Sequence, residues 1–408
     1  MDEILSGLND QQAKAVTHSG TPVLVLAGAG SGKTKALTHR TAWLIKDQKI
    51  EPGNILLLTF TNKAAAEMLN RVKNLVGDSD IPFAGTFHRF CALVLRKHGY
   101  HVGVPAGYVI FDDDDQLSIM KELVRNRGLD SKRFKPESVL GQISYAKNDL
   151  ISPQSMADRA VSSYQETIAQ LYADYQRIMR KNEAVDFDDL LVLTVQVLAE
   201  QPSLKNQYAN QYQHVMVDEY QDTNTAQYAL TRMLSDQWRN LMVVGDFSQA
   251  IYSWRGADYR NLELLSKDYP DLTTIKLEQN YRSTQTILKA ASKLISHNRS
   301  HPVLDLWTES NGGEQVTIYE AMDEVGEAQF VSQTIRHQVL MGANYKDFVI
   351  MYRTNAQSRA VEESLLREGE PYVLIGGVRF YSRKEIKDLL AYLRLVANPN
   401  DSISRERA

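Results

Sequence analysis

The chain has 408 residues, which is too long for one hydrophobic core and predicts about two to three domains. Its 43% hydrophobic and 24% charged residues are ordinary for a globular protein. The formal net charge of −4 excludes binding of nucleic acid through overall positive charge. Any nucleic-acid site would therefore have to be a local groove of basic and aromatic side chains.

Neither a disulfide framework nor a membrane span is expected. Cys91 is the one cysteine of the sequence, and its neighbours in HRFCALVL predict a buried thiol on a helix. No apolar run approaches the ~18 residues of a membrane span. The N-terminal segment MDEILSGLND is acidic and lacks the apolar core of a signal peptide. We therefore expect a cytoplasmic protein without a membrane partner.

Four apolar runs predict strands, and each precedes a segment with helical character. They are PVLVLA (22–27), NILLLTF (54–60), HVMVD (214–218) and LMVVGD (241–246). Continuously apolar strands that alternate with helices are typical of a parallel sheet covered on both faces. The fold class is therefore α/β, and ligands are expected at the carboxyl ends of these strands.

Two regions depart from this first α/β pattern. Residues from about 100 to 186 are helical and polar, so we expect a helical insertion in which Asp112–Asp115 begins a helix and does not form a metal cage. After 278, the runs QVTIYEA (315–321), DFVIMYR (347–353) and PYVLIGG (371–377) predict strands of a second α/β domain. The predicted division is 1–100 with 187–277, then 101–186, then 278–408.

A phosphate-binding loop is predicted at AGAGSGKT, residues 27–34, between the first strand and a helix. This is the Walker A pattern, with Ala27 in place of its first glycine. Glycines allow backbone N–H groups to surround a phosphate, and the helix N-terminus adds positive potential. Lys33 would reach the β- and γ-phosphates, and the Thr34 hydroxyl would bind Mg²⁺. The predicted phosphate-binding residues are Ala29, Gly30, Ser31, Gly32, Lys33 and Thr34.

A second nucleotide motif is predicted at VMVDEYQD, residues 215–222. Asp218 follows an apolar strand and would hold Mg²⁺, which is the Walker B role. Glu219 is placed to polarise the attacking water. Taken alone, the pair could equally be an acidic helix cap. Together with the Walker A segment it predicts hydrolysis of Mg²⁺-ATP.

Motifs in this order resemble the superfamily 1 DNA helicases of the UvrD/Rep/PcrA type. The resemblance extends from near the N-terminus to about residue 401 and implies a RecA-like P-loop NTPase fold with an incomplete second RecA-like domain. Besides the two nucleotide motifs, it is carried by LNDQQAKAV (8–16), LLTFTNKAAAEM (57–68), GTFHRF (85–90), VDFDDLL (185–191), LEQNYRST (277–284), VIMYRTNAQSRAVEESLL (349–366) and GGVRFYSRKEIKDLLAYLRL (376–395).

The resemblance implies roles for further residues of the nucleotide site. Gln12 would read the adenine edge, and Tyr281 would stack on the adenine ring. Arg282 and Gln249 would contact the γ-phosphate. Lys35 follows GKT, where the family commonly has arginine, so the flat guanidinium that would cover the adenine is absent.

The resemblance also implies a path for single-stranded DNA. Ring faces suit bases and cations suit phosphates, and stacking contributes about 1–3 kcal/mol per base. Packing roles remain the alternative for Tyr252, Trp254 and His88, and a solvated helix surface remains the alternative for Arg359. The residues implied to line the path are Phe60, Asn62, His88, Tyr252 and Trp254, with Arg353, Asn355 and Arg359 from the second domain.

This sequence also departs from the family pattern. Phe247 and Ser248 follow GD where the family usually has a further acidic residue, and Arg89 replaces a serine. We expect altered packing at Phe247 and no loss of chemistry. The family's motifs V and VI are not found before Ala408, so the chain is expected to be part of a longer protein or a short homologue.

The function expected from the resemblance is that of an ATP-dependent 3′→5′ translocase and helicase. It would use ATP and Mg²⁺ and act on single-stranded DNA and on junctions with duplex, as a monomer and with possible repair or replication partners. The alternative is a binding module or helicase-like subunit without unwinding activity of its own. An unrelated P-loop ATPase would not explain Gln12, Tyr252 and Trp254 together.

Overall fold

The computed structural model describes residues 2–77, 83–250, 260–298, 303–375 and 384–407. The chain forms two compact units, Met1–Gly313 with Leu390–Ala408, and Glu314–Leu389. The first unit contains the sheet and the helical insertion, and the second contains a helix pair.

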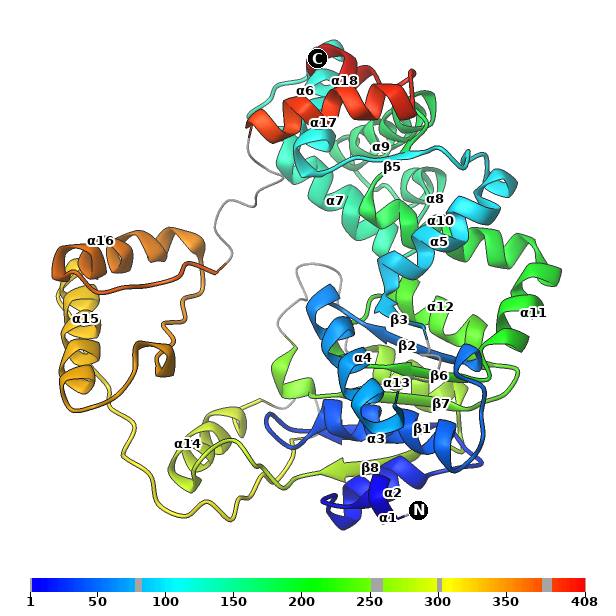
Figure 1. The fold of residues 1–408 in the computed structure, drawn as a ribbon. Coiled ribbons are helices and arrows are strands. Elements are labelled where there is room, and N and C mark those ends of the chain that lie inside the picture. The colour runs from blue at the N-terminus through cyan, green and yellow to red at the C-terminus, as the bar shows by residue number, and fades with distance from the viewer. Residues whose placement is uncertain (1, 78–82, 251–259, 299–302, 376–383, 408) are drawn as a thin grey trace. The chain divides into compact units, whose positions relative to one another are not determined.

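A parallel sheet lies at the centre of the first unit, and Figure 1 shows its strands side by side. Within the described residues the sheet has six strands in the order β3-β2-β6-β7-β1-β8. This arrangement confirms the predicted α/β class and its four apolar strands. The strands are β1 (Val23–Ala27), β2 (Ile55–Thr59), β3 (Phe83–Thr86), β6 (His214–Val217), β7 (Leu241–Gly245) and β8 (Thr273–Leu277), every pair parallel.

Both faces of the sheet are buried, which explains why its strands are continuously apolar. Successive side chains of a strand point to opposite faces, so Leu24 and Leu26 join one core while Val23 and Val25 join the other. The helices of this part of the first unit are α1 (Asp2–Leu5), α2 (Asp10–Thr17), α3 (Lys33–Lys46), α4 (Asn62–Val76), α5 (Phe87–His98), α10 (Phe187–Glu200), α11 (Pro202–Gln211), α12 (Thr225–Ser235), α13 (Arg260–Asp268) and α14 (Gln285–Ile295).

Cys91 lies on α5 and is fully buried, which confirms the predicted core thiol. Burial raises the pKa of the Cys91 thiol to about 12, so the side chain stays protonated. Among the described residues, no helix is both long and apolar enough to cross a bilayer.

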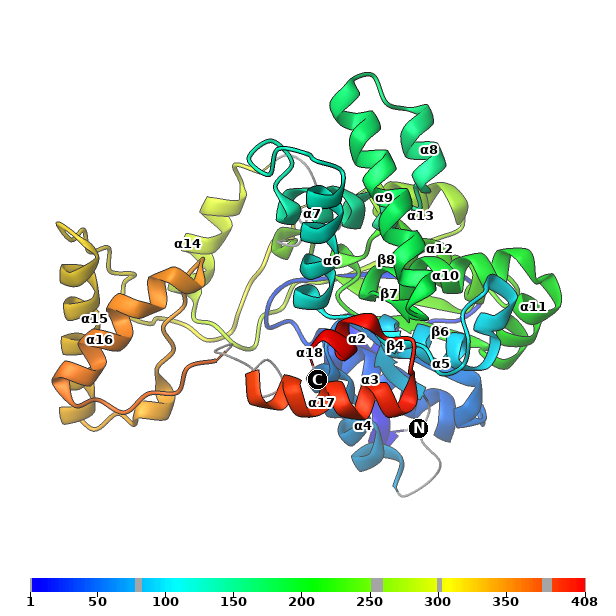
Figure 2. The ribbon, with the colours of Figure 1, turned by 90° about the horizontal axis from the view of Figure 1, so that it is seen from above.

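The helical insertion has a hydrophobic core of its own, formed around Ile119, Ile143 and Leu171. Its helices gather beside one another in Figure 2. Asp112 caps the first of them and accepts from the backbone N–H groups of Asp114 and Asp115, as the acidic run predicted. The elements are β4 (Val109–Ile110), α6 (Asp113–Asn126), α7 (Pro136–Asn148), α8 (Pro153–Asp158), α9 (Ser163–Lys181) and β5 (Ala184–Val185).

The C-terminal segment packs against this insertion, which the sequence did not predict. It consists of the end of α17 (Lys384–Ala397) and α18 (Ser402–Arg407). Arg394 forms an ion pair with Asp115 at 2.9 Å, and the Asn398 amide donates to the Asn182 carbonyl at 2.7 Å. These polar contacts join segments that are more than 200 residues apart.

The second unit corrects the strands predicted after 278. Helices α15 (Glu324–Leu340) and α16 (Ser358–Glu368) pack together, with Ser332 and Ser364 hydrogen-bonded at 2.9 Å. The described parts of 315–321, 347–353 and 371–377 form no strand, so that prediction was wrong. A strand needs a neighbouring backbone to pair with as well as an apolar pattern. Without such a neighbour, Ile318 is 93% exposed and Val349 is 79% exposed.

His214, at the start of β6, predicts how the free energy of unfolding depends on pH. Burial, and then the charge of Arg40, lower the pKa of His214 to about 4, and its buried Nδ1 has no hydrogen-bond partner in the described part of the chain. Between pH 6.5 and 4 the unfolded chain binds this proton and the folded chain does not, so acidification favours unfolding. The H214Q variant is expected to lose less unfolding free energy than the parent over this range, as measured by urea unfolding. An identical pH dependence in both proteins would contradict this.

Candidate nucleotide and DNA site

The phosphate-binding loop lies between the end of β1 and the start of α3. Gly30 and Gly32 have φ of 71° and 89°, a left-handed conformation that favours glycine. A Cβ at Gly30 would come within 2.7 Å of the Arg282 Cβ, and one at Gly32 within 2.6 Å of the Gln12 amide nitrogen. Both positions therefore need glycine for conformation and for space. The arrangement of strand, loop and helix is the one that the Walker A pattern predicted.

Acidic side chains lie beside this loop at the end of β6. The Lys33 Nζ contacts the Glu219 Oε2 at 2.9 Å, which places the two predicted catalytic residues together. Glu219 has a φ of 50°, a strained value for a residue with a side chain. Such strain is typical of functional turns.

Asp218 has the properties of a cation ligand. It is 5% exposed, and its Oδ1 has no hydrogen-bond partner among the described residues. Burial raises its pKa to about 7, helped by the Glu219 carboxylate and opposed by Lys33. Mg²⁺ is commonly held by one or two carboxylates together with substrate phosphates. The buried, unpaired oxygen therefore fits Mg²⁺, with the Thr34 hydroxyl near the start of α3 as the second predicted ligand.

Gln221 connects this acidic pair with Gln249. Its amide donates to the Glu219 Oε2 at 2.8 Å and accepts from the Asp246 N–H at 3.0 Å. Gln249 in turn donates to the Asp246 Oδ2 at 2.6 Å. Gln221 was not among the predicted site residues, although its position two residues after Glu219 was a usable signal; its side chain is 3% exposed. Phe247 is buried in the core, which agrees with the expected packing role.

Gln12 and Tyr281, which were predicted to bind the adenine base, both contact the phosphate-binding loop. The Gln12 amide donates to the Ser31 carbonyl at 2.9 Å, and the Tyr281 N–H donates to the Gly30 carbonyl at 2.9 Å. Tyr281 is 57% exposed, so its ring has a face available for stacking.

Three further residues complete this side of the loop. Asn9 donates to the Tyr281 hydroxyl at 2.8 Å and to Gln279 at 3.1 Å, and neither Asn9 nor Gln279 was singled out from sequence. The Lys35 Nζ donates to the Gly7 carbonyl at 2.6 Å, which directs this side chain toward the N-terminal segment.

Two family models cover nearly the whole chain. Residues 8–270 match the UvrD/REP helicase N-terminal domain, and residues 275–408 match the UvrD-like helicase C-terminal domain. The chain belongs to the UvrD/REP helicase family.

Curated relatives agree with this assignment. The chain is 46% identical over 408 residues to ATP-dependent DNA helicase PcrA of Staphylococcus aureus (strain NCTC 8325 / PS 47). It is 45% identical over the same length to ATP-dependent DNA helicase PcrA of Staphylococcus epidermidis (strain ATCC 12228 / FDA PCI 1200). All of this chain is covered, but only 56% of either relative, so the chain spans about half the length of these proteins.

In this UvrD/REP chain, three predicted DNA contacts lie at the ends of neighbouring strands. Thr59 of β2 pairs with Thr86 of β3, and Phe60, Asn62 and His88 follow these two residues. The side chains therefore come from one edge of the sheet. Asn62 is exposed, whereas Phe60 and His88 are half-buried.

Aromatic neighbours surround the half-buried pair. Phe60 packs edge-on against Phe87 at 6.3 Å between ring centroids, and His88 packs against Phe187 at 5.8 Å. Phe187 is 48% exposed and was not singled out, although an aromatic residue inside VDFDDLL was a usable signal.

Of the other five residues predicted to contact DNA, the structure describes three. Tyr252 and Trp254 lie outside the described residues. Arg353, Asn355 and Arg359 are exposed in the second unit. Arg359 forms an ion pair with Glu363 at 2.9 Å along α16, which is the geometry of the alternative helix-surface role.

Proposed function

We propose that this chain is the ATP- and DNA-binding part of a 3′→5′ DNA helicase that hydrolyses Mg²⁺-ATP. The observation that carries the proposal is the meeting of Lys33, Glu219 and Asp218 at the carboxyl ends of β1 and β6, where the Asp218 Oδ1 has no hydrogen-bond partner among the described residues. The family membership and the activity named for the relatives, ATP-dependent DNA helicase PcrA, support the same function.

In the proposed reaction, the loop N–H groups and the start of α3 bind the phosphates. Lys33 leaves Glu219 for the β- and γ-phosphates, and Glu219 then accepts a hydrogen bond from the attacking water. Arg282 and Gln249 stabilise the charge on the γ-phosphate. Mg²⁺, when bound between Asp218 and Thr34, would neutralise phosphate charge.

On the DNA side, Phe60, His88, Tyr252 and Trp254 would stack with bases of a single strand. Asn62 and the exposed Arg353, Asn355 and Arg359 would contact the backbone. Junctions with duplex, a monomeric state, a cytoplasmic location, and repair or replication partners belong to the same proposal. So does the division into 1–100 with 187–277, 101–186, and 278–408.

The decisive test is ATP turnover by the purified chain with and without oligo-dT. Stimulation by the single strand is expected. Binding of ATP and oligo-dT without stimulated turnover would favour the binding-module alternative, and undetectable nucleotide binding would overturn the proposal.

The proposed DNA path predicts that Trp254 contributes to the affinity for single-stranded DNA. The W254A variant is expected to bind oligo-dT about 5- to 150-fold more weakly, which corresponds to the loss of one stacked base. Basal ATP binding should not change. Fluorescence anisotropy with labelled oligo-dT measures this effect. The control is W238A, which removes a tryptophan that is 43% exposed after α12. Equal affinities of W254A and the parent would assign Trp254 to packing.

A further inference from the structure

Two short contacts join the segment after Glu219 to the helical insertion. The Asn224 amide nitrogen donates to the Asn148 Oδ1 at 2.6 Å, and the Thr225 hydroxyl donates to the Asp149 Oδ1 at 2.6 Å. Asn148 and Asp149 lie at the C-terminal end of α7, 76 residues before their partners. Both asparagines are 6% exposed. Water therefore competes weakly for these hydrogen bonds.

The segment between Glu219 and Asn224 is short and held along its length. It forms a 3₁₀ turn, η3 (Tyr220–Asp222), in which Tyr220 is 1% exposed. The Thr223 hydroxyl donates to the Tyr220 carbonyl at 2.7 Å, and the Asn261 amide donates to the Thr223 carbonyl at 2.8 Å. Close-packed elements transmit displacements instead of absorbing them. We therefore expect a shift at Glu219 to reach Asn224.

Glu219 is a residue whose contacts a bound nucleotide would change. Its carboxylate is paired with Lys33 at 2.9 Å. Phosphates at the loop would compete for the same lysine, so the ion pair must open. Glu219 also has a strained backbone, with a φ of 50°. Opening of the ion pair would allow this turn to adopt a less strained conformation.

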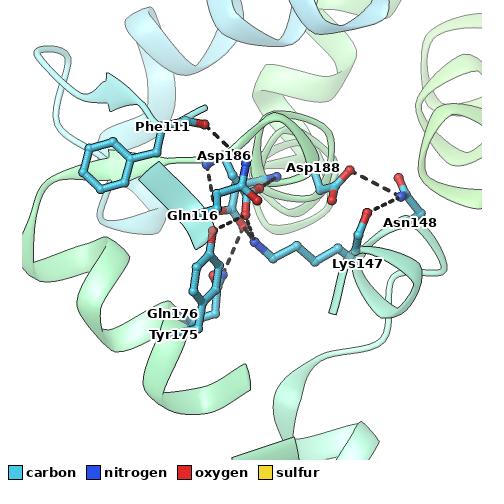
Figure 3. A network of polar contacts seen from close by, with 10 residues as sticks. Phe111, Gln116, Lys147, Asn148, Tyr175, Gln176, Asp186 and Asp188 are labelled. Atoms are coloured by element: carbon cyan, nitrogen blue, oxygen red, sulfur yellow. Dashed lines mark hydrogen bonds and ion pairs between the residues drawn. The ribbon is translucent and has the colours of Figure 1, made fainter. Parts of the chain in front are cut away.

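The C-terminal end of α7 is held by side-chain contacts with the start of α10, as Figure 3 shows. Asn148 donates to the Asp188 Oδ1 at 3.3 Å. The adjacent Lys147 contacts Asp186 at 2.5 Å and Asp189 at 2.7 Å. These carboxylates belong to the start of α10, so α7 and α10 are held together beside the Asn224 contact.

We propose that Asn148 and Asn224 are positioning residues that transmit the state of the nucleotide site to the helical insertion. Thr225 and Asp149 support the same contact. The inference rests on the proposed nucleotide site. It adds a path from that site to the insertion, distinct from the Gln221–Asp246–Gln249 path described above.

The variants can separate this contact from helix capping. Asn224 also caps α12, where its Oδ1 accepts from the Gln227 N–H at 2.9 Å. Serine is a good cap but is too short to reach Asn148, and T225V removes the hydroxyl while keeping the shape. The test protein is therefore the double variant N224S/T225V. The control is Q142A, which removes the hydrogen bond from α7 to Tyr164.

Hydrogen exchange of the full chain, with and without ATPγS and Mg²⁺, tests the inference. In the parent and in Q142A, nucleotide should change the exchange of residues 28–35, 218–225 and 136–148. In the double variant, the change at 28–35 should remain, and the change at 136–148 should fall at least about threefold. A purely structural role would alter exchange equally with and without nucleotide.

The possible failures are distinguishable. No nucleotide effect at 28–35 in the parent would overturn the proposed nucleotide site and the inference with it. An effect at 28–35 without one at 136–148 would overturn the inference alone. So would an effect at 136–148 that persists undiminished in the double variant.

Discussion

Replacing Lys33 by alanine is expected to lower ATP turnover at least about 100-fold, the scale for removal of one preorganised charge-stabilising donor. Lys33 lies at the start of α3, and its ammonium group contacts Glu219 at 2.9 Å, next to Asp218, whose Oδ1 accepts no hydrogen bond from any described residue. Alanine removes the charge for the phosphates and leaves Glu219 without its cation. Phosphate release at saturating ATP and oligo-dT is the measurement.

The same variant tests whether the nucleotide and DNA sites are separable. Phe60, Asn62 and His88 follow β2 and β3, whereas Lys33 begins α3 after β1. DNA affinity of K33A should therefore match that of the parent and of K46A, a control at the opposite end of α3. If K33A lost DNA affinity by the same factor as ATP turnover, the nucleotide and DNA sites would not be separable.

Replacing Lys147 by methionine is expected to destabilise the chain by about 3–5 kcal/mol, the usual cost of removing one partner of a buried ion pair. Lys147 is 1% exposed and lies between the carboxylates of Asp186 and Asp189, with the Tyr175 hydroxyl donating to Asp186 at 2.9 Å (Figure 3). Burial by itself lowers the pKa of Lys147, but these two carboxylates raise it, so the lysine stays charged. Methionine fills the space but leaves two buried carboxylates without their cation.

Urea unfolding followed by circular dichroism measures the free energy of unfolding of K147M. The control is K132M, because Lys132 is exposed in the same insertion and such substitutions usually change stability by less than about 0.5 kcal/mol. A loss below about 1 kcal/mol for K147M would indicate that the cluster relaxes or takes up protons. That result would contradict a tightly fixed charge network.

Local sequence patterns predicted the parts of the nucleotide site because each part is short and chemically distinctive. The glycines of AGAGSGKT predicted a loop between a strand and a helix, and Asp218–Glu219 was predicted to follow an apolar strand. The structure has this loop between β1 and α3 and this acidic pair directly after β6. The edge strands β3 and β8 were not identified, since FAGT is short and TTIKL alternates between exposed and buried side chains.

The sequence by itself determined the class of the first unit and the residues of its phosphate loop, because burial on both sheet faces demands apolar runs and a left-handed turn demands glycine. Tertiary structure alone decided which distant side chains meet. Gln221 links Glu219 to Asp246, Asn224 reaches Asn148, and Arg394 reaches Asp115. The same holds for the runs after 314, which have a strand pattern but pair with no strand among the described residues. Side-chain hydrogen bonds and strand pairing both need a second segment, and its position is set by the fold instead of by local periodicity.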